Sequence, residues 1–142
     1  MSIENGERNS TAKAYLDPAR PRKNLTVITN TQVQKILFNG NEATGISYKK
    51  ADGEIIKVDA LKEVILSAGA VGSPQLLMLS GVGPASHLKD HGISIIADMP
   101  GVGQNLNDHP DFVLKYKCLE PVSIWPQTRL VGRTFAGIRW LL

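Results

Sequence analysis

The feature that most constrains this chain is a short, uninterrupted apolar run that leads directly into a glycine-rich turn. The run is Val-Ile-Leu at residues 64–66, and residues 68–73 then read Ala-Gly-Ala-Val-Gly-Ser. A continuous apolar run is typical of a strand that is buried on both faces in a parallel sheet. The sequence therefore predicts a strand, a glycine turn and a helix as the central unit of the chain.

The helix after this turn has start and stop signals. Ser73 is predicted to cap the helix, and Pro74 suits its first position. Three leucines then supply an apolar face, and Gly81 is placed to end the helix. The chain beyond it predicts a short helix closed by glycine, a strand and a tight turn, at residues 85–90, 93–97 and 99–103 respectively.

Upstream of residue 63 the pattern is that of strands and tight turns. Residues 11–16 could end a helix, which Asp17-Pro18 is predicted to stop. Residues 25–29 are rich in β-forming side chains. Three further strands are predicted at residues 33–38, 44–49 and 55–58, with Asn-Gly and Asp-Gly turns between them. Strands joined by such short turns predict an antiparallel meander.

Composition excludes several classes of protein. The 142 residues, with 42% hydrophobic and 20% charged side chains, fit one globular domain or part of one. The net charge of +3 includes a basic cluster at Arg20, Arg22 and Lys23, but no aromatic platform accompanies it, so no nucleic-acid partner is predicted. Glycines and prolines interrupt the uncharged stretch after residue 63, so no transmembrane segment is predicted.

The cellular location is predicted from two features. Cys118 is the only cysteine, which excludes an internal disulfide and favours a reducing compartment. The first residues carry no apolar signal region. We therefore expect a cytoplasmic protein, with association with a membrane left open.

The glycine turn could bind an anion. A strand that enters a helix through such a turn directs free backbone N–H groups and the positive end of the helix dipole at one point. The turn lacks the third glycine of the dinucleotide fingerprint, however, and glycine is also used in such turns for packing alone. From the residues themselves, both interpretations stay open.

A family resemblance adds to these physical arguments. Residues 69–83 read GAVGSPQLLMLSGVG and resemble the second signature of the glucose–methanol–choline oxidoreductases. The segments on either side are similar to the same family, as are two segments nearer the start; these are residues 62–69, 100–109, 8–16 and 24–27. Residues 116–142 are most similar to the choline dehydrogenase branch. The resemblance covers nearly the whole chain.

The resemblance implies an α/β fold with α+β character. Residues 1–110 would form part of a Rossmann-like FAD-binding domain that includes the antiparallel meander, and residues 111–142 would begin the substrate-domain region. Such a fold is expected to be incomplete without flanking sequence. The implied function is that of a fragment of an FAD-dependent oxidoreductase, which oxidises a small-molecule alcohol by hydride transfer to the flavin and passes the electrons to an acceptor that the sequence does not identify. A truncated, non-catalytic flavin-fold module is the alternative.

The resemblance also assigns cofactor contacts within the chain. In the family, a valine before the meander meets the adenine through its backbone, and Val33 occupies that place. The Ala68-Gly69 turn is expected to pass close to the cofactor. The family places Asn105, Asp108 and His109 near the flavin; local hydrogen bonds within their loop are the alternative role for Asn105 and Asp108.

No catalytic residue is expected in this chain. The family's carboxy-terminal pair, a histidine with a histidine or asparagine, has no counterpart here, nor has its amino-terminal glycine fingerprint. His109-Pro110-Asp111 imitates two ligands of an iron triad, but only His87 and His91 could complete it, and both lie upstream in or at the end of a predicted helix. We therefore predict no metal site.

Overall fold

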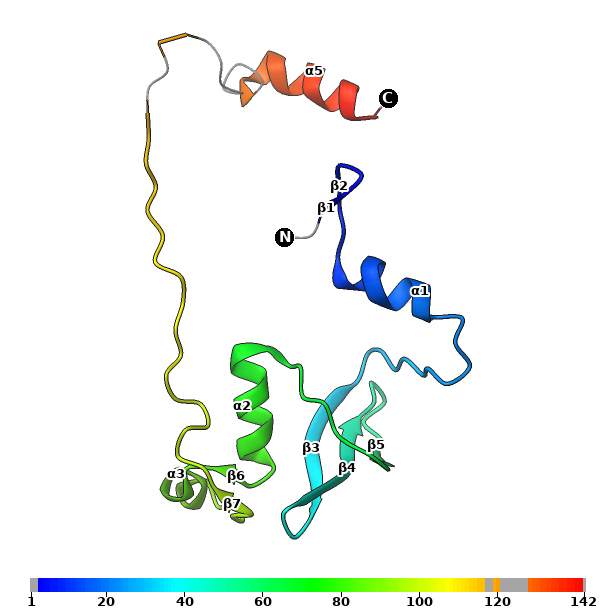
Figure 1. Cartoon of the computed structure of the whole chain (residues 1–142), viewed down its shortest axis with the longest axis vertical. Helices are drawn as coiled ribbons and strands as arrows, with labels where there is room; N and C mark the ends of the chain where they lie inside the picture. The colour runs from blue at the N-terminus through cyan, green and yellow to red at the C-terminus, as the bar shows by residue number, and fades with distance from the viewer. Residues whose placement is uncertain (1–2, 117–118, 121–127, 142) are drawn as a thin grey trace. The chain divides into compact units, whose positions relative to one another are not determined.

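The computed structural model describes residues 3–116, 119–120 and 128–141. The chain forms two compact units, Met1–Leu106 and Asn107–Leu142, which are described separately. The first unit contains strands β1 to β7 and helices η1 to α3, and the second contains helix α5 (Figure 1). The assignment of residues 1–110 and 111–142 to two functional domains stays a prediction.

The chain begins with a small hairpin followed by a helix. Strand β1 (Ile3–Glu4) pairs antiparallel with β2 (Glu7–Arg8). The π-helix η1 (Ala12–Leu16) continues directly into α1 (Asp17–Ala19). The predicted stop at Asp17-Pro18 is therefore wrong. Pro18 lies in the first turn of α1, where proline is tolerated because its fixed φ suits a helix and a backbone N–H is not needed.

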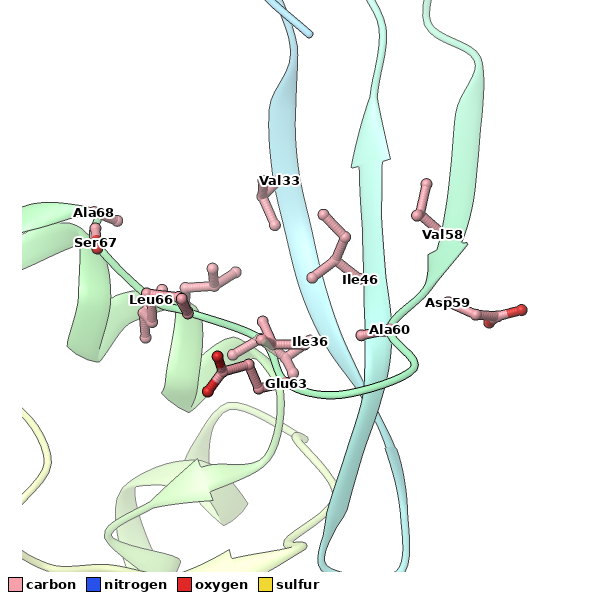
Figure 2. A pocket seen from close by; sticks show the side chains of 14 residues that line it. Val33, Ile36, Ile46, Val58, Asp59, Ala60, Glu63, Leu66, Ser67 and Ala68 are labelled. Carbon is pink, nitrogen blue, oxygen red and sulfur yellow. The ribbon is translucent and has the colours of Figure 1, made fainter. Parts of the chain in front are cut away.

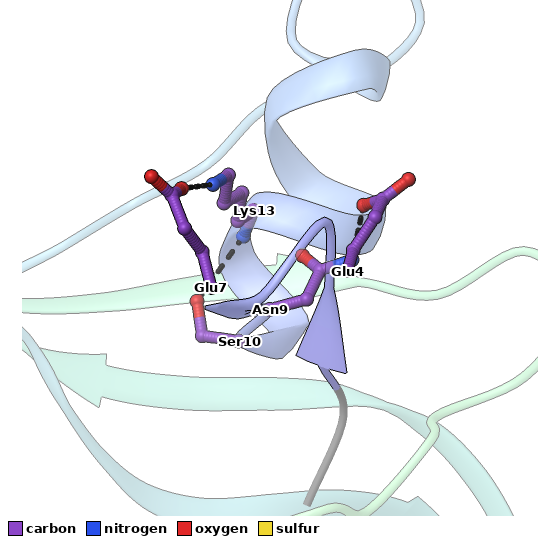
Figure 3. A network of polar contacts seen from close by, with 5 residues as sticks. All are labelled: Glu4, Glu7, Asn9, Ser10 and Lys13. Atoms are coloured by element: carbon purple, nitrogen blue, oxygen red, sulfur yellow. Dashed lines mark hydrogen bonds and ion pairs between the residues drawn. The ribbon is translucent and has the colours of Figure 1, made fainter.

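Polar side chains connect this hairpin with η1 (Figure 3). Lys13 Nζ donates a hydrogen bond to Glu7 Oε2 at 2.8 Å, and the Lys13 backbone N–H donates to Ser10 Oγ at 3.3 Å. Asn9 Nδ2 donates to Glu4 Oε2 at 2.6 Å. These contacts are exposed, so they fix the local geometry of the segment rather than form a core.

The meander is present as predicted. Its strands are β3 (Gln32–Asn39), β4 (Glu42–Lys49) and β5 (Ile55–Asp59), in the order β3-β4-β5 and antiparallel throughout. Gly45 on β4 has no room for a side chain, because a Cβ atom there would meet the backbone oxygen of Val58. Ile36 and Tyr48 are buried on this sheet.

Two other segments with strand-like sequences form no strand. The structure assigns no strand to residues 25–29 or to residues 64–66, and Ile65 is 77% exposed. The prediction of a strand buried on both faces at residues 64–66 is therefore wrong for this chain. A strand exists only through hydrogen bonds to a neighbouring strand, and no described segment pairs with either of these two.

Helix α2 (Gly69–Leu79) begins earlier than predicted. Ser73 is not its N-cap, and Pro74 lies inside the helix rather than at its first position. Ser73 still satisfies a backbone donor at this end, because its Oγ accepts a hydrogen bond from the Ala68 N–H at 3.1 Å. The predicted stop is confirmed: Gly81 has a φ of +93°, which ends the helix in the left-handed conformation that favours glycine.

A compact unit follows α2. Strand β6 (Val82–Gly83) pairs parallel with β7 (Ala97–Asp98), and α3 (Ala85–Asp90) lies between them in sequence. Leu88 of α3 is fully buried, and Asp98 Oδ1 accepts a hydrogen bond from the Ala85 N–H at 2.9 Å. Helix α3 confirms the prediction, as does the turn at residues 100–103.

The strand predicted at residues 93–97 is reduced to β7. The Ile93 N–H donates to the Leu88 carbonyl at 2.9 Å. The first residue of the predicted strand therefore satisfies a carbonyl at the carboxy-terminal end of α3. Only the last part of the predicted strand is free to pair with β6.

The second unit contains α5 (Leu130–Leu141), whose Arg133 N–H bonds to the Arg129 carbonyl at 2.7 Å. In the part of the chain that the structure describes, no helix combines the length and the apolar character that crossing a bilayer requires. The overall fold is mixed helix and strand with an antiparallel meander, in agreement with the predicted fold class.

Candidate functional site

A cavity of about 480 Å³ lies between the meander and the segment that leads into α2 (Figure 2). One wall is formed by side chains of the sheet, among them Val33, Ile36 and Ile46. The opposite wall is formed by residues 63–68 and by Leu76 of α2. The volume is in the usual range for small-molecule sites, and the lining is mainly apolar.

The strand wall presents backbone as well as side chains. Among the described residues β3 is an edge strand, because β4 is the one strand that pairs with it there. An edge strand leaves backbone N–H and C=O groups without a partner in the ladder. The pairing register of β3 shifts between Val33 and Lys35, as in a β-bulge, which changes how the backbone is directed near Val33. Val33 therefore lies where a planar ligand could contact both an apolar surface and free backbone groups.

The helix wall begins at the amino end of α2. Ala68 lines the cavity and stands immediately before the first residue of the helix. The first turn of α2 contains no acidic side chain. The N–H groups of this turn and the helix dipole therefore favour a partly negative group, with no carboxylate in the turn to oppose it.

Charged side chains are few around the cavity. Among its lining residues only Asp59 and Glu63 carry charge, and no cation is present. A ligand with a pyrophosphate would therefore need its charge neutralised by groups other than these lining residues. The cavity suits the ring systems of such a ligand better than its phosphates.

Gly69 is adjacent to the cavity but does not line it. Its φ of +85° requires glycine, while a Cβ atom built there would meet no atom within 4 Å. The glycine is thus explained by backbone conformation, and space is available beside it. Close approach of a cofactor to this turn stays a prediction.

The other predicted contacts lie elsewhere. Asn105, with a φ of +57°, follows the turn at residues 100–103. Its neighbours Gly103, Gln104 and Leu106 line a second cavity of about 530 Å³ against α2. Asn105 is therefore not brought to the cavity that contains Val33.

Asp108 and His109 belong to the second unit and are fully exposed. Asp108 Oδ1 accepts a hydrogen bond from the His109 N–H at 2.7 Å and lies 3.7 Å from His109 Nδ1. This is the kind of local hydrogen bond that was the alternative role for Asp108. A cofactor role for Asn105, Asp108 and His109 stays a prediction.

The described residues show no cluster of three histidine, cysteine, aspartate or glutamate side chains that could hold a metal ion. His87 and His91 contact each other edge to face, with ring centroids 4.7 Å apart.

Sequence reasoning did not single out Ser80, which connects the two walls of the cavity. A hydroxyl residue directly before the glycine that ends a helix is the only signal that could have indicated it.

Comparison with known proteins identifies the family. The model of the GMC oxidoreductase family matches residues 1–111. The chain therefore belongs to the glucose–methanol–choline (GMC) oxidoreductase family, whose members are FAD-dependent oxidoreductases that act on CH–OH groups.

Curated relatives match over almost the whole chain. The oxygen-dependent choline dehydrogenase of Paraburkholderia phymatum is 47% identical over 138 residues, which are 97% of this chain and 24% of that enzyme. The enzyme of the same name from Yersinia pseudotuberculosis is 47% identical over 96% of this chain and 24% of its own length. The chain thus spans about a quarter of the length of the curated relatives it matches.

Solved structures support the same fold. Pyridoxine 4-oxidase from Mesorbium loti matches with a TM-score of 0.63 and 37% identity, over 69% of this chain and 19% of that structure. A fungal aryl-alcohol oxidase matches with a TM-score of 0.60 and 38% identity, over 65% of this chain and 16% of that structure.

Proposed function

We propose that this chain supplies one part of the FAD site of an enzyme that oxidises a small alcohol, with choline or a chemically similar alcohol as substrate. The observation that carries the proposal is the 47% identity to a choline dehydrogenase across 97% of the chain. The cavity between Val33 and Ala68 supports it, because its size and apolar lining suit a planar ring.

Bound FAD would supply the acceptor for the hydride that leaves the alcohol carbon. The residues of this chain would hold and orient it. The edge of β3 at Val33 offers backbone groups to an adenine ring, and the first turn of α2 offers N–H groups to a partly negative atom. The apolar walls would exclude water from the bound ring. No residue of this chain is assigned the proton transfer.

The residues fit part of an FAD site and not all of it. No cation lines the cavity, and the sequence lacks a glycine-rich pyrophosphate loop. The isolated chain should therefore bind FAD weakly or not at all, and a purified sample should be colourless. Stoichiometric flavin that stays with the isolated chain through gel filtration would contradict this part of the proposal.

The proposal is tested in a chimera in which this chain replaces the 138 residues aligned in the Paraburkholderia phymatum enzyme. The chimera should retain FAD, seen in its absorption spectrum, and should oxidise choline. A chimera that folds but retains no flavin would support the alternative of a non-catalytic flavin-fold module.

A cytoplasmic location is part of the proposal, and the single cysteine supports it. Fractionation of cells that express the tagged chain tests it.

A further inference from the structure

Ser80 connects the two walls of the cavity through a pair of hydrogen bonds. Its Oγ accepts a hydrogen bond from the backbone N–H of Ile36 at 2.8 Å. Its hydroxyl donates to the carbonyl oxygen of Leu76, one helical turn earlier, at 2.6 Å. Ser80 is 6% exposed, so water competes little for either bond. We call this pair of bonds the Ser80 bridge.

Both partners of the Ser80 bridge line the cavity. Ile36 belongs to the strand wall and Leu76 to the helix wall. The bridge therefore joins the two surfaces between which a ring would have to fit. Val33 lies on the same strand as Ile36, and Ala68 lies at the other end of the helix that carries Leu76.

The Ser80 bridge also provides a hydrogen-bond acceptor for a backbone N–H group at the edge of β3. The Ile36 N–H points away from β4, since its acceptor is on the other side of β3. A buried backbone donor without a partner is costly, so this edge needs an acceptor from outside the sheet. Ser80 supplies that acceptor and ties the helix to one residue of the strand, which apolar packing alone would not specify.

We propose that Ser80 is a positioning residue for the cofactor: through Ile36 and Leu76 it holds the β3 edge and α2 at the separation that FAD binding requires. This inference rests on the proposed function. Ser80 touches neither the proposed ring site nor any reacting atom; it acts through the two walls. Loss of its hydroxyl should therefore weaken FAD binding more than it weakens the apoprotein.

The experiment uses the full-length chimera described above, in apo and FAD-loaded form. The variants are Ser80→Ala, Ser80→Thr and, as the control, Ser47→Ala. Ser47 is 7% exposed on β4 and does not line the cavity, so its variant removes a comparably buried hydroxyl away from the bridge. FAD dissociation constants are measured by reconstitution of the apoprotein, apoprotein stability by thermal unfolding, and exposure of the Ile36 region by hydrogen exchange with mass spectrometry.

Ser80→Ala should raise the FAD dissociation constant about tenfold and speed exchange in β3. Ser80→Thr keeps the hydroxyl and should stay within about threefold of the unmodified chimera, as should Ser47→Ala. Equal FAD affinity for Ser80→Ala and Ser47→Ala, or unchanged exchange around Ile36, would overturn the positioning role. An unmodified chimera that binds no FAD would instead refute the proposed function, so the two failures are distinguishable.

Discussion

The meander and the segment before α2 contain similar β-forming side chains, yet only the meander forms strands. Ile36 on β3 is 7% exposed, while Ile65 is 77% exposed. β3 has β4 beside it, and residues 64–66 have no strand beside them among the described residues. Side-chain type is therefore a weaker determinant of strand structure than the presence of a neighbour close in the chain.

The two regions also differ in how far their partners lie in sequence. Each strand of the meander is followed by the next after a short turn, so the 142 residues contain everything the pairing needs. A strand buried on both faces of a parallel sheet needs partners that only long connections can bring alongside. The relatives, four times as long as the matched segment, have room for such partners.

The largest expected effect comes from one substitution made in both regions. Ile36→Ala should lower the local stability of the meander by about 3 kcal/mol, because it opens a cavity in a buried site. Ile65→Ala should change the isolated chain by less than about 0.5 kcal/mol, because that side chain is already in water. Native-state amide exchange of β4 measures the change in stability that each of the two substitutions causes.

The same two substitutions, made in the full-length chimera, test whether residues 64–66 become a buried strand there. There Ile65→Ala should cost about 2 kcal/mol or more, as partner strands cover the segment. If Ile65→Ala stays neutral in the folded chimera, residues 64–66 are not a buried strand of the complete sheet either.

Gly45→Ala tests whether close pairing holds the meander together. The added Cβ would collide with the Val58 carbonyl oxygen of β5, so the meander should lose about 2 kcal/mol. Gly101→Ala is the control, since nothing lies within 4 Å of its Cβ position and its φ is not positive. Equal amide-exchange rates in β5 for both variants would show that β4 and β5 can separate without cost.

A smaller effect is expected at the turn that follows residues 64–66. Gly69→Val and Gly92→Val both place a branched side chain at a positive φ with open space around it, so both should cost about 1 to 2 kcal/mol in backbone strain. If the cofactor approaches Gly69, only Gly69→Val should also lower the flavin content of the chimera. Val33→Ala should lower it little, because a contact through backbone atoms survives truncation. Equal flavin content in all three variants would leave Gly69 a conformational glycine only.

The smallest expected effect is a pH dependence in the exposed hairpin, which contrasts with the apolar packing of Ile36 and Tyr48 on the meander. The hydrogen bond and charge of Lys13 lower the pKa of Glu7, and Glu7 raises the pKa of Lys13 in turn. The Glu7 contribution is present above the ordinary glutamate pKa and is lost as the pH falls through the lowered value. The Lys13 contribution is present below the ordinary lysine pKa and is lost as the pH rises through the raised value.

Amide exchange in η1, corrected for intrinsic rates, should therefore be slowest between about pH 5 and about pH 10, with a change of less than about threefold on either side. The variant Lys13→Met should remove both limbs of this profile. A profile that Lys13→Met leaves unchanged would show that the ion pair does not order the helix.

The sequence predicted those parts of the fold whose determinants are local. The three strands of the meander, the stop at Gly81 and helix α3 follow from turn residues and short-range patterns, and the structure confirms them. The predicted start of α2 was wrong for two reasons. Gly69 begins the helix from a positive φ, and the Ser73 hydroxyl accepts its hydrogen bond from a position inside the helix rather than at its N-cap. Pro18 was read as a stop, although a first helical turn accepts it.

The predicted cofactor contacts do not all lie together in the structure. Val33 and Ala68 line one cavity, as a shared role requires, but their roles toward FAD stay predictions. The place of Ser80 before Gly81 marks it as a residue at a helix end, but its bond to Ile36 could not be predicted, because the two residues are 44 positions apart and the bond depends on how the edge of β3 meets α2. Contacts of this kind are fixed by three-dimensional packing, which no local sequence pattern encodes.

The β6-α3-β7 unit has a consequence for the order in which the chain acquires structure. Its strands are joined by residues 84–96 alone, and it contains the fully buried Leu88 and the Asp98 contact to the start of α3. Parallel strands are among the slowest elements to pair when their connection is long, because loop closure precedes any favourable contact. With so short a connection, this unit can close before distant segments arrive. During synthesis on the ribosome, the folded β6-α3-β7 unit would be available for α2 to pack against while the carboxy-terminal residues are still being made.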